Sequence, residues 1–365
     1  MQFIDLKTQY SRLKLEIDTR IHQVLDHGQF IMGPEVGEVE RALASYVNVP
    51  HCISVASGTV SLEIALRALD IGPGDEVVTV PFTWISSAEV IPLVGAKPVF
   101  IDIDPITYNI DVDQLERSIT KRTKAIIAVS LFGQMPDYQR INSIADAHGL
   151  TVIEDGAQSF GATQNGKKSC GVTRIASTSF FPAKTLGCFG DGGAIFTTDD
   201  DIATRMRAIR THGGIKRHHH PYVGMNARFD TLQAAILLAK MPHFDWEVDQ
   251  RNQIGANYTA KLKNLCQTPS VKDGNTHVYA QYTIRVPDRD FVAEQLKLKQ
   301  IPTAVYYPKC LHEQPIFESL GYRWGDFPES EKASREVLSL PMHPFLSEED
   351  QDRVVLAIEH SLQPV

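Results

Sequence analysis

The side chains best suited to chemistry are Asp155 and Lys184. Asp155 follows a short apolar run, residues 151–153, and Glu154, whereas Lys184 lies between a second apolar run and the glycine-rich residues 187–193. In open α/β sheets ligands bind at the carboxyl ends of strands, where a buried acid is costly unless it has a partner. Burial can lower the pKa of a lysine from about 10.4 and free its amine for Schiff-base chemistry.

A buried acid and a reactive lysine are the two groups that pyridoxal phosphate (PLP) requires. The lysine holds the aldehyde of PLP as an imine, and the acid keeps the pyridine nitrogen protonated so that the ring accepts electrons. The alternative is that Asp155 caps a turn and Lys184 lies on a solvated surface, which is commoner for single residues of these types. The agreement of several independent motifs favours the functional interpretation.

Two strings carry a resemblance to a known family. EDGAQSFGA, from Glu154, and SFFPAKTLGCFGDGGA, from Ser179, resemble the PLP-binding core of the DegT–StrS family of nucleotide-sugar aminotransferases, in the family's order and at its separation. The resemblance extends from FIDLKTQY near the start of the chain to LPMHPF near its end. It implies an α/β fold, the PLP-dependent transferase fold type I of the aspartate aminotransferase superfamily, with a mixed, mostly parallel sheet.

The resemblance also implies how the chain is divided and assembled. Residues 1–245 are expected to form a large PLP-binding domain with an N-terminal helical segment, and residues 246–365 a smaller C-terminal α+β domain. The molecule is expected to be a homodimer with shared active sites.

Hydrophobic patterns predict where the main elements lie. Apolar runs of four to six residues alternate with helical segments, which is typical of βαβ units and a largely parallel sheet. Strands are predicted at residues 52–55, 76–80, 97–102, 123–131, 277–284 and 302–308. Helices are predicted at residues 5–27, 199–212, 244–264 and 290–299, and Gly28 is expected to stop the first of them.

A small-residue turn, Ser57-Gly58-Thr59, precedes an apolar helix. The free N–H groups at the start of a helix bind anions, although such a turn is by itself a common helix start. The resemblance implies that Gly58, Thr59 and Ser179 hold the cofactor phosphate. It also implies that Gln158 orients the ring through its 3′-oxygen.

Further contacts to the cofactor and substrate follow from the same resemblance. Trp84 is expected to stack on the pyridine ring, with Phe82 as the alternative stacking residue and a plain core role as the alternative for Trp84. The string Gly224–Arg228 matches the family motif G-x-N-x-R, in which Asn226 reaches across the homodimer to the phosphate of the partner's cofactor. Arg228 faces that same site, where an arginine can pair bidentately with a carboxylate of a uronic-acid sugar or of glutamate.

Three aromatic residues are candidate substrate contacts. Tyr306 and Tyr307 stand where the family often carries His-Tyr-Pro, so Tyr306 departs from that pattern. Phe30 lies in a loop that resembles the family's glycine-proline turn, and a core position is its equally weighted alternative. The adjacent histidines 218–220 cannot all face one ion from a regular element, so we expect a surface or substrate-side loop and no metal, with their role left open.

Composition sets the general class of the molecule. The chain has 365 residues and a formal net charge of −8, which gives no support to nucleic-acid binding. Five scattered cysteines without a C-x-x-C pair favour a reducing, cytoplasmic location. No apolar run approaches the roughly 20 residues that span a bilayer, so no membrane association is expected.

Taken together, these features predict an aminotransferase that moves an amino group from L-glutamate, leaving 2-oxoglutarate, to a keto group of a nucleotide-linked sugar. The strings RHHHPYVGMNARFDTLQAAIL and IPTAVYYP most resemble enzymes acting on UDP-linked 3-keto sugars of the 2-acetamido-glucuronate type, used in lipopolysaccharide O-antigen assembly. The keto position, C3 or C4, and the nucleotide, UDP or dTDP, remain open.

Three other functions were weighed. Sugar dehydration is disfavoured because dehydrating relatives carry histidine where Lys184 stands, although deaminating relatives keep the lysine. A catalytically silent binding or regulatory module is disfavoured by the intact set of site residues. A nicotinamide enzyme is rejected because the glycines of GCFGDGG are spaced G-x-x-G-x-G and a strand is expected to follow.

Overall fold

The computed structural model describes residues 1–362. Its helices are α1 Leu6–Arg12, α2 Lys14–His27, α3 Pro34–Val47, α4 Gly58–Ala68, α5 Ser86–Leu93, α6 Val112–Ser118, α7 Tyr138–His148, α8 Asp200–Arg210, α9 Thr231–Leu262, α10 Arg289–Leu298, α11 Pro328–Glu336 and α12 Glu348–Leu362. Its strands are β1 His51–Val55, β2 Glu76–Thr79, β3 Lys97–Phe100, β4 Thr123–Val129, β5 Thr151–Asp155, β6 Thr163–Gln164, β7 Lys167–Lys168, β8 Ile175–Ser179, β9 Gly193–Thr197, β10 Tyr282–Arg285 and β11 Val337–Leu340. Short 3₁₀ helices are η1 Leu131–Gly133, η2 Leu311–Glu313 and η3 Pro315–Leu320.

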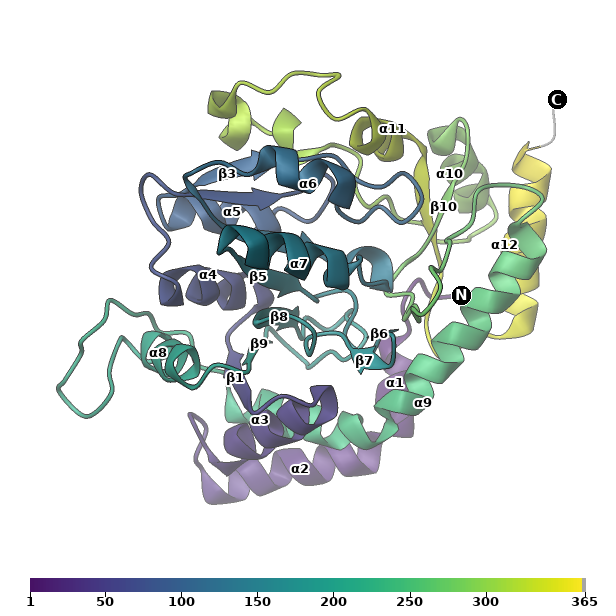
Figure 1. Ribbon diagram of the computed structural model, residues 1–365. Coiled ribbons are helices and arrows are strands. Elements are labelled where there is room, and N and C mark those ends of the chain that lie inside the picture. Colours follow the sequence, from purple (N-terminus) through teal and green to yellow (C-terminus); the bar gives the residue numbers. More distant parts are fainter. Residues whose placement is uncertain (363–365) are drawn as a thin grey trace.

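A seven-stranded sheet in the order β1-β9-β8-β5-β4-β2-β3 forms the centre of the molecule (Figure 1). The strands β3, β2, β4, β5 and β8 pair in parallel, and only β9 runs antiparallel to its neighbours β8 and β1. Apolar residues dominate most of these strands because both faces of the sheet are covered. The predicted mixed, mostly parallel α/β fold is confirmed.

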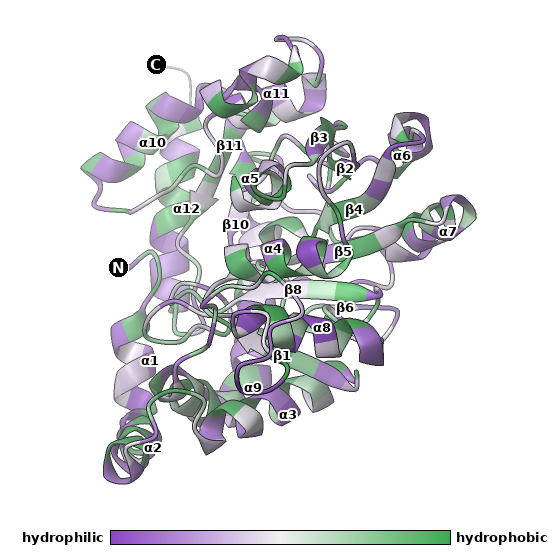
Figure 2. Ribbon diagram, turned by 90° about the vertical axis from the view of Figure 1, so that its left-hand side faces the viewer, coloured by the Kyte–Doolittle hydropathy of each residue, from purple (hydrophilic) through white to green (hydrophobic). Residues whose placement is uncertain are grey.

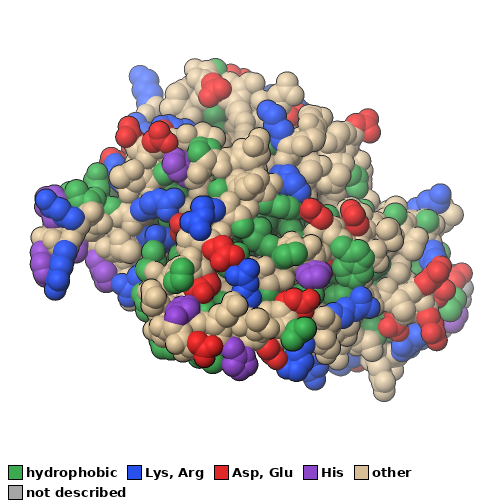
Figure 3. Space-filling view, turned by 90° about the horizontal axis from the view of Figure 1, so that it is seen from below, with side chains coloured by type: hydrophobic (Ala, Val, Ile, Leu, Met, Phe, Trp, Pro, Cys, Tyr) green, Lys and Arg blue, Asp and Glu red, His purple; other side chains and the backbone are tan. Residues whose placement is uncertain are grey.

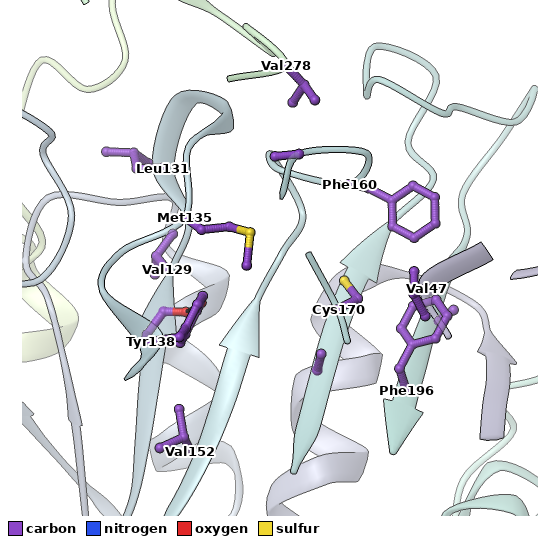
Figure 4. Close-up of a cluster of buried hydrophobic side chains, with 14 of the residues drawn as sticks. Val47, Val129, Leu131, Met135, Tyr138, Val152, Phe160, Cys170, Phe196 and Val278 are labelled. Atoms are coloured by element: carbon purple, nitrogen blue, oxygen red, sulfur yellow. Dashed lines mark hydrogen bonds between the residues drawn. The ribbon is translucent and has the colours of Figure 1, made fainter. Parts of the chain in front are cut away.

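Alternate residues of each strand point into two separate cores. Val152 belongs to the core that contains residues of α3, α7 and α9, and Ile153 to the core that contains residues of α4, α5 and α8. Figure 4 shows part of the first core, where Tyr138 and Val152 lie near one another and Phe160 near Phe196. Figure 2 shows polar and apolar residues alternating along many helices, as expected of helices that cover one face of a sheet.

The C-terminal part has its own small core, in which β10 and β11 pack with α10, α12 and the second half of α9. The helix α9 runs without interruption from beneath the main sheet to this region (Figure 1). The expected division between residues 245 and 246 therefore falls inside one helix, and the two-domain description stays a prediction.

The predicted helix at residues 5–27 is two helices, because the chain bends at Leu13, where φ is −104° and ψ is 16°. Both helices contact α9: Gln9 of α1 donates to Glu247 Oε1 at 2.8 Å, and Ile17 of α2 packs with Ile236. One straight helix could not follow α9 in both places. Gly28 ends α2 with φ +69°, as expected.

Two predicted strands are shorter or absent. Of residues 277–284, only 282–284 belong to β10. The first part of the segment packs instead against the turn after β4, where Val278 N–H donates to the carbonyl of Gly133 at 3.0 Å. Within residues 302–308 only Ala304 pairs with a strand, at Ser339 of β11. The tyrosines that follow turn instead toward the end of β5.

None of the helices among residues 1–362 combines the length and the apolar character needed to cross a membrane. The histidines 218–220 are exposed, in a loop that extends away from α8 (Figure 1). Seen from below in Figure 3, histidine and basic side chains gather at the tip of this projection. Residues 216 and 217, a lysine and an arginine, are its exposed cations.

Candidate active site

The predicted cofactor residues meet at one edge of the main sheet. Asp155 ends β5 and Ser179 ends β8, which is the parallel neighbour of β5. The helix α4 begins beside Ser179, and Lys184 lies in the loop that follows β8. Because parallel strands place their carboxyl ends together, residues far apart in the sequence are neighbours here.

Asp155 is buried and held by two donors. The Ser87 hydroxyl donates to Oδ2 at 2.7 Å, and the N–H of Ala157 donates to Oδ1 at 3.2 Å. The carboxylate is therefore fixed in one orientation without an ion pair in the described chain. Ser87 was missed in the sequence, although the serine pair that follows Trp84 was a usable signal for it.

Lys184 is half-buried, and its own N–H donates to the carbonyl of Phe181 at 2.8 Å. Burial lowers the pKa of the Lys184 ammonium below its usual range, and the nearby Asp155 carboxylate opposes that shift. A lowered pKa increases the fraction of free amine near neutral pH, which Schiff-base chemistry requires.

Gln158 is held between two elements. Its Oε1 accepts the N–H of Phe132 at 2.8 Å, and its Nε2 donates to the Tyr307 hydroxyl at 3.1 Å. Burial raises the pKa of Tyr307 far above its usual range, so the hydroxyl keeps its proton. The site thus includes Tyr307, one of the two tyrosines predicted to contact substrate.

The two candidate stacking rings differ in exposure. Trp84 is 58% exposed, with its ring centroid 6.2 Å from that of Tyr307, whereas Phe82 is fully buried among Tyr108, Phe132 and Tyr307. Trp84 is therefore not a core aromatic. Of the two rings, only Trp84 can lie against a ligand in the site.

The start of α4 has the form of an anion cradle. Ser57 caps the helix by accepting the N–H of Val60 at 3.1 Å, and nothing in residues 1–362 accepts the N–H groups of Gly58 and Thr59. A Cβ on Gly58 would lie 2.8 Å from the Cβ of Ser179, so a side chain there would close the space. The helix dipole favours a phosphate at such a position.

These residues fit PLP. Gly58, Thr59 and Ser179 would hold its phosphate, Asp155 would face its pyridine nitrogen, and Lys184 would bind its aldehyde carbon. The glycine gap and the unpaired N–H groups of α4 leave room for an anion where the family pattern expects one. The fit rests on this geometry and on the donor and acceptor chemistry of the side chains.

For four predicted residues the structure shows surroundings but no contact that assigns a role. Phe30 is 47% exposed, so its core alternative is wrong, and its carbonyl accepts the N–H of Thr231 at 3.1 Å. Asn226 is exposed and pairs only through its backbone with Thr211. Arg228 has a buried Nε with no acceptor in the described chain, and Tyr306 packs edge-on against Tyr307.

Behind Asp155, Glu154 points to the other face of the sheet and is fully buried. The Ser169 hydroxyl donates to its Oε1 at 2.6 Å and the N–H of Cys170 donates to its Oε2 at 3.0 Å. Burial, opposed by these donors, raises the pKa of Glu154 to about 7 from an ordinary value of 4.5.

This pKa predicts a pH-dependent stability difference between the wild type and Glu154→Gln. Between pH 4.5 and 7 the folded protein keeps a proton on Glu154 that the unfolded chain has released, so the contribution of Glu154 to stability falls as pH rises. The free energy of unfolding of the wild type relative to Glu154→Gln should fall by up to about 3 kcal/mol over this range. Chemical denaturation at several pH values measures it.

The matched control is Glu318→Gln, which changes an exposed carboxylate that forms no ion pair within residues 1–362. Its difference from the wild type should stay constant over the same range. A constant difference for Glu154→Gln as well would show that Glu154 is ionised throughout, contrary to the expected burial effect.

Comparisons with known proteins agree with this geometry. The chain matches the model of the DegT/DnrJ/EryC1/StrS aminotransferase family over residues 11–359. It is 52% identical to a UDP-2-acetamido-2-deoxy-3-oxo-D-glucuronate aminotransferase of Pseudomonas aeruginosa, covering 95% of this chain and 96% of that protein. It is 48% identical to a pleiotropic regulatory protein of Geobacillus stearothermophilus, covering 96% of each.

Among solved structures, NtdA of Bacillus subtilis with bound cofactor PMP is 30% identical, with a TM-score of 0.89, covering 99% of this chain and 83% of that chain. The predicted family and the predicted cofactor are both confirmed. The chain therefore belongs to the DegT/DnrJ/EryC1/StrS aminotransferase family, whose cofactor is pyridoxal phosphate.

Proposed function

We propose that this sugar aminotransferase transfers an amino group from L-glutamate to the C3 keto group of UDP-2-acetamido-2-deoxy-3-oxo-D-glucuronate, for the assembly of a lipopolysaccharide O-antigen sugar. The observation that carries the reaction type is the placement of Asp155 and the pKa-lowered Lys184 at the same sheet edge as the α4 cradle. The choice of substrate is supported by the relative from Pseudomonas aeruginosa, which is named for that activity.

In this proposal each residue has a defined task. Bound PLP supplies a pyridinium ring that accepts the electron pair left when the α-proton of glutamate departs. Lys184 Nζ takes that proton and later returns one at the sugar carbon. Asp155, held by Ser87 and Ala157, keeps a negative charge opposite the ring nitrogen, and Gln158 fixes the ring plane.

Isotope transfer tests the substrate directly. The protein is incubated with ¹⁵N-glutamate and, separately, with a UDP-linked 3-keto uronate, a UDP-linked neutral 3-keto sugar and a dTDP-linked 4-keto sugar. The proposal predicts that the label reaches the UDP-linked 3-keto uronate with the highest kcat/KM. A preference for the 4-keto sugar would contradict the proposed substrate while leaving amino transfer intact.

Arg228 is proposed to pair with the substrate carboxylate, because its buried Nε has no partner within residues 1–362. A charged hydrogen bond of this kind contributes about 1.5–3 kcal/mol, so Arg228→Ala should raise KM for the UDP-linked uronate by about 10-fold to 100-fold. The KM for the neutral 3-keto analogue should change about twofold or less. Steady-state kinetics with both substrates provides the comparison.

Arg140→Ala is the matched control, since it removes an arginine side chain that is 54% exposed and pairs with Asp113 on the surface. Both KM values should then stay unchanged. An equal loss for acidic and neutral substrates in Arg228→Ala would rule out the carboxylate role.

We also propose a homodimer in which Asn226 and Arg228 of one subunit complete the site of the other. Asn226 is exposed on its own subunit, and its side chain forms no hydrogen bond within residues 1–362. Phe30 and Phe181 are also exposed, as apolar side chains at a subunit interface would be in a single subunit.

Subunit mixing tests the shared site. Lys184→Ala and Asn226→Ala subunits are each expected to be poorly active alone, because every site lacks one group. Mixed dimers contain one site with both Lys184 and Asn226, so mixing should restore activity well above the sum of the two separate preparations. Strict additivity, or a monomer in light scattering, would contradict the shared site.

A regulatory role is the second candidate, favoured by the name of the 48% identical relative from Geobacillus stearothermophilus. It would require a protein that takes up no PLP, or that binds it without turnover on any keto sugar. The deaminating alternative differs in another respect, since it would release ammonia from an amino sugar without consuming glutamate. Absorbance after addition of PLP, together with the isotope experiment, tests the first alternative, and ammonia release from an amino sugar without glutamate tests the second.

A further inference from the structure

Lys240, in the first half of α9, is a lysine that the proposed reaction does not use. Only 2% of the residue is exposed, although lysine is almost never fully buried unless it is paired. Its Nζ donates to the carbonyl of Gly187 at 2.6 Å and lies 4.5 Å from the ring centroid of Phe189. It forms no salt bridge with any residue in the described range.

The carbonyl that Lys240 holds belongs to the loop that carries Lys184. This loop, residues 180–192, is closed at its base, where Phe180 N–H donates to Gly192 and Cys188 N–H donates to Phe180, both at 2.8 Å. Gly187 fits tightly inside it, since a Cβ there would lie 2.5 Å from the carbonyl oxygen of Pro182. A displacement of Gly187 would therefore move the turn that bears Lys184.

A second side chain of α9 holds the same loop. Gln233 lies seven residues before Lys240, on the same face of the helix, and its Oε1 accepts the N–H of Phe189 at 2.8 Å. The Gln233 amide also lies against Gly190, where a Cβ would be 3.1 Å from Nε2. The loop is thus attached to α9 at two points, Gly187 and Phe189.

We propose that Lys240 is a positioning residue that fixes the Lys184 loop through the carbonyl of Gly187. The inference rests on the proposed role of Lys184. A charged donor to a carbonyl away from water gives a stronger and more directional contact than a neutral one. Gln233 supports the same loop from the adjacent turns of α9.

The charge state agrees with this task. Burial lowers the pKa of Lys240 to about 8, while Glu247 on the same helix and the Cys188 thiol in the loop oppose the shift. The ammonium form is therefore the major form at pH 7. Lys240 acts through Gly187 and is not placed to touch substrate.

The test compares the PLP-loaded full-length wild type with Lys240→Met, which keeps an unbranched apolar stem but removes the charge and the donor. The rate of PLP dissociation is followed, together with the circular dichroism of the visible PLP band per bound cofactor, which reports how the ring is held. We expect dissociation to be about tenfold faster or more, a loss of about 1.4 kcal/mol, and a changed dichroism. Lys240→Arg should recover part of both.

Lys261→Met is the matched control, on the same helix but at a lysine whose side chain is 29% exposed and pairs with Asp352 and Glu348 at the surface. It should leave both readouts unchanged. Should Lys240→Met fail to fold, Gln233→Leu takes its place, and it is expected to shift the same two readouts because it removes the other attachment of the loop to α9.

Unchanged dissociation and dichroism in Lys240→Met would overturn the positioning role while leaving the function of Lys184 intact. If Lys240→Met does not fold, unchanged readouts in Gln233→Leu would show that the attachment of the loop to α9 does not position Lys184, and this would overturn the proposal in the same way. Borohydride reduction of the wild type, followed by mass spectrometry, identifies the lysine that binds PLP. It therefore distinguishes failure of the positioning role from failure of the proposed function. If PLP is not found on Lys184 in the wild type, the proposed function falls and this inference falls with it.

Discussion

Lys184→Ala is expected to abolish the visible absorption band of lysine-bound PLP and to lower amino transfer by about a thousandfold or more. The side chain supplies both the covalent attachment and the amine that moves the proton. Lys240 is not free to replace it, because its Nζ is engaged with the carbonyl of Gly187. Absorbance and single-turnover kinetics with ¹⁵N-glutamate measure the two effects.

The control for this variant is Lys167→Ala, at an exposed lysine of β7. It should keep both the band and the turnover. Far-ultraviolet circular dichroism should show that Lys184→Ala remains folded, because a half-buried lysine without a salt bridge contributes little to stability. Full transaminase activity in Lys184→Ala would refute the assignment of this lysine.

Asp155→Asn is expected to keep the fold and bind PLP weakly, while turnover falls by about 100-fold to 10,000-fold. The amide has the shape of the carboxylate: its oxygen can still accept the N–H of Ala157, and its NH2 group can donate to the Ser87 hydroxyl oxygen. It carries no negative charge, so it cannot keep the pyridine nitrogen protonated. The ratio of kcat between variant and wild type at saturating PLP is the measurement.

Ser87→Ala separates the charge of Asp155 from its orientation. It removes the 2.7 Å hydrogen bond to Oδ2 but leaves the carboxylate and the Ala157 contact. A hydrogen bond to a charged group contributes about 1.5–3 kcal/mol, so the loss in turnover should be at most about 100-fold. Wild-type turnover in both Asp155→Asn and Asp155→Ala would exclude the proposed role of this acid.

Much of the fold and the heart of the site could be predicted from the sequence. The positions of Asp155 and Lys184 could be recognised because each lies next to a short apolar run, and strand ends are where an α/β sheet binds ligands. The start of α4 was visible in Ser57-Gly58-Thr59, since small residues before an apolar helix mark a helix start, whereas the phosphate at this turn was implied by the family resemblance.

The features that could not be predicted from the sequence depend on contacts between distant segments. Ser87 belongs to α5, which follows β2, and it reaches Asp155 because the folded sheet brings α5 close to the end of β5. The strand order that brings these segments together cannot be read from the sequence. The hydrogen bond from Gln158 to Tyr307 joins two segments far apart in the chain, and hydrophobic periodicity does not indicate that they meet. The break at Leu13 is a tertiary effect, because helical periodicity continues through it.

The exposure of side chains in the structure distinguishes between alternatives that residue types left open in two cases. Phe82 and Trp84 are both aromatic and two positions apart, yet only the burial of Phe82 leaves Trp84 free to meet a ligand. By residue type alone, Phe30 was equally well suited to a core position, and its exposure excludes that position. The roles of Asn226 and Arg228 remain predictions, because their proposed partners lie on a second copy of the chain.

The central claim is that Lys184 and Asp155 carry a PLP-dependent amino transfer from glutamate. The most direct measurement is an absorbance spectrum of the PLP-loaded protein before and after adding L-glutamate. The account predicts that the visible band disappears, that a near-ultraviolet pyridoxamine phosphate band replaces it, and that 2-oxoglutarate is released. A visible band that glutamate leaves unchanged would contradict glutamate as the donor, and the absence of any band would contradict the account as a whole.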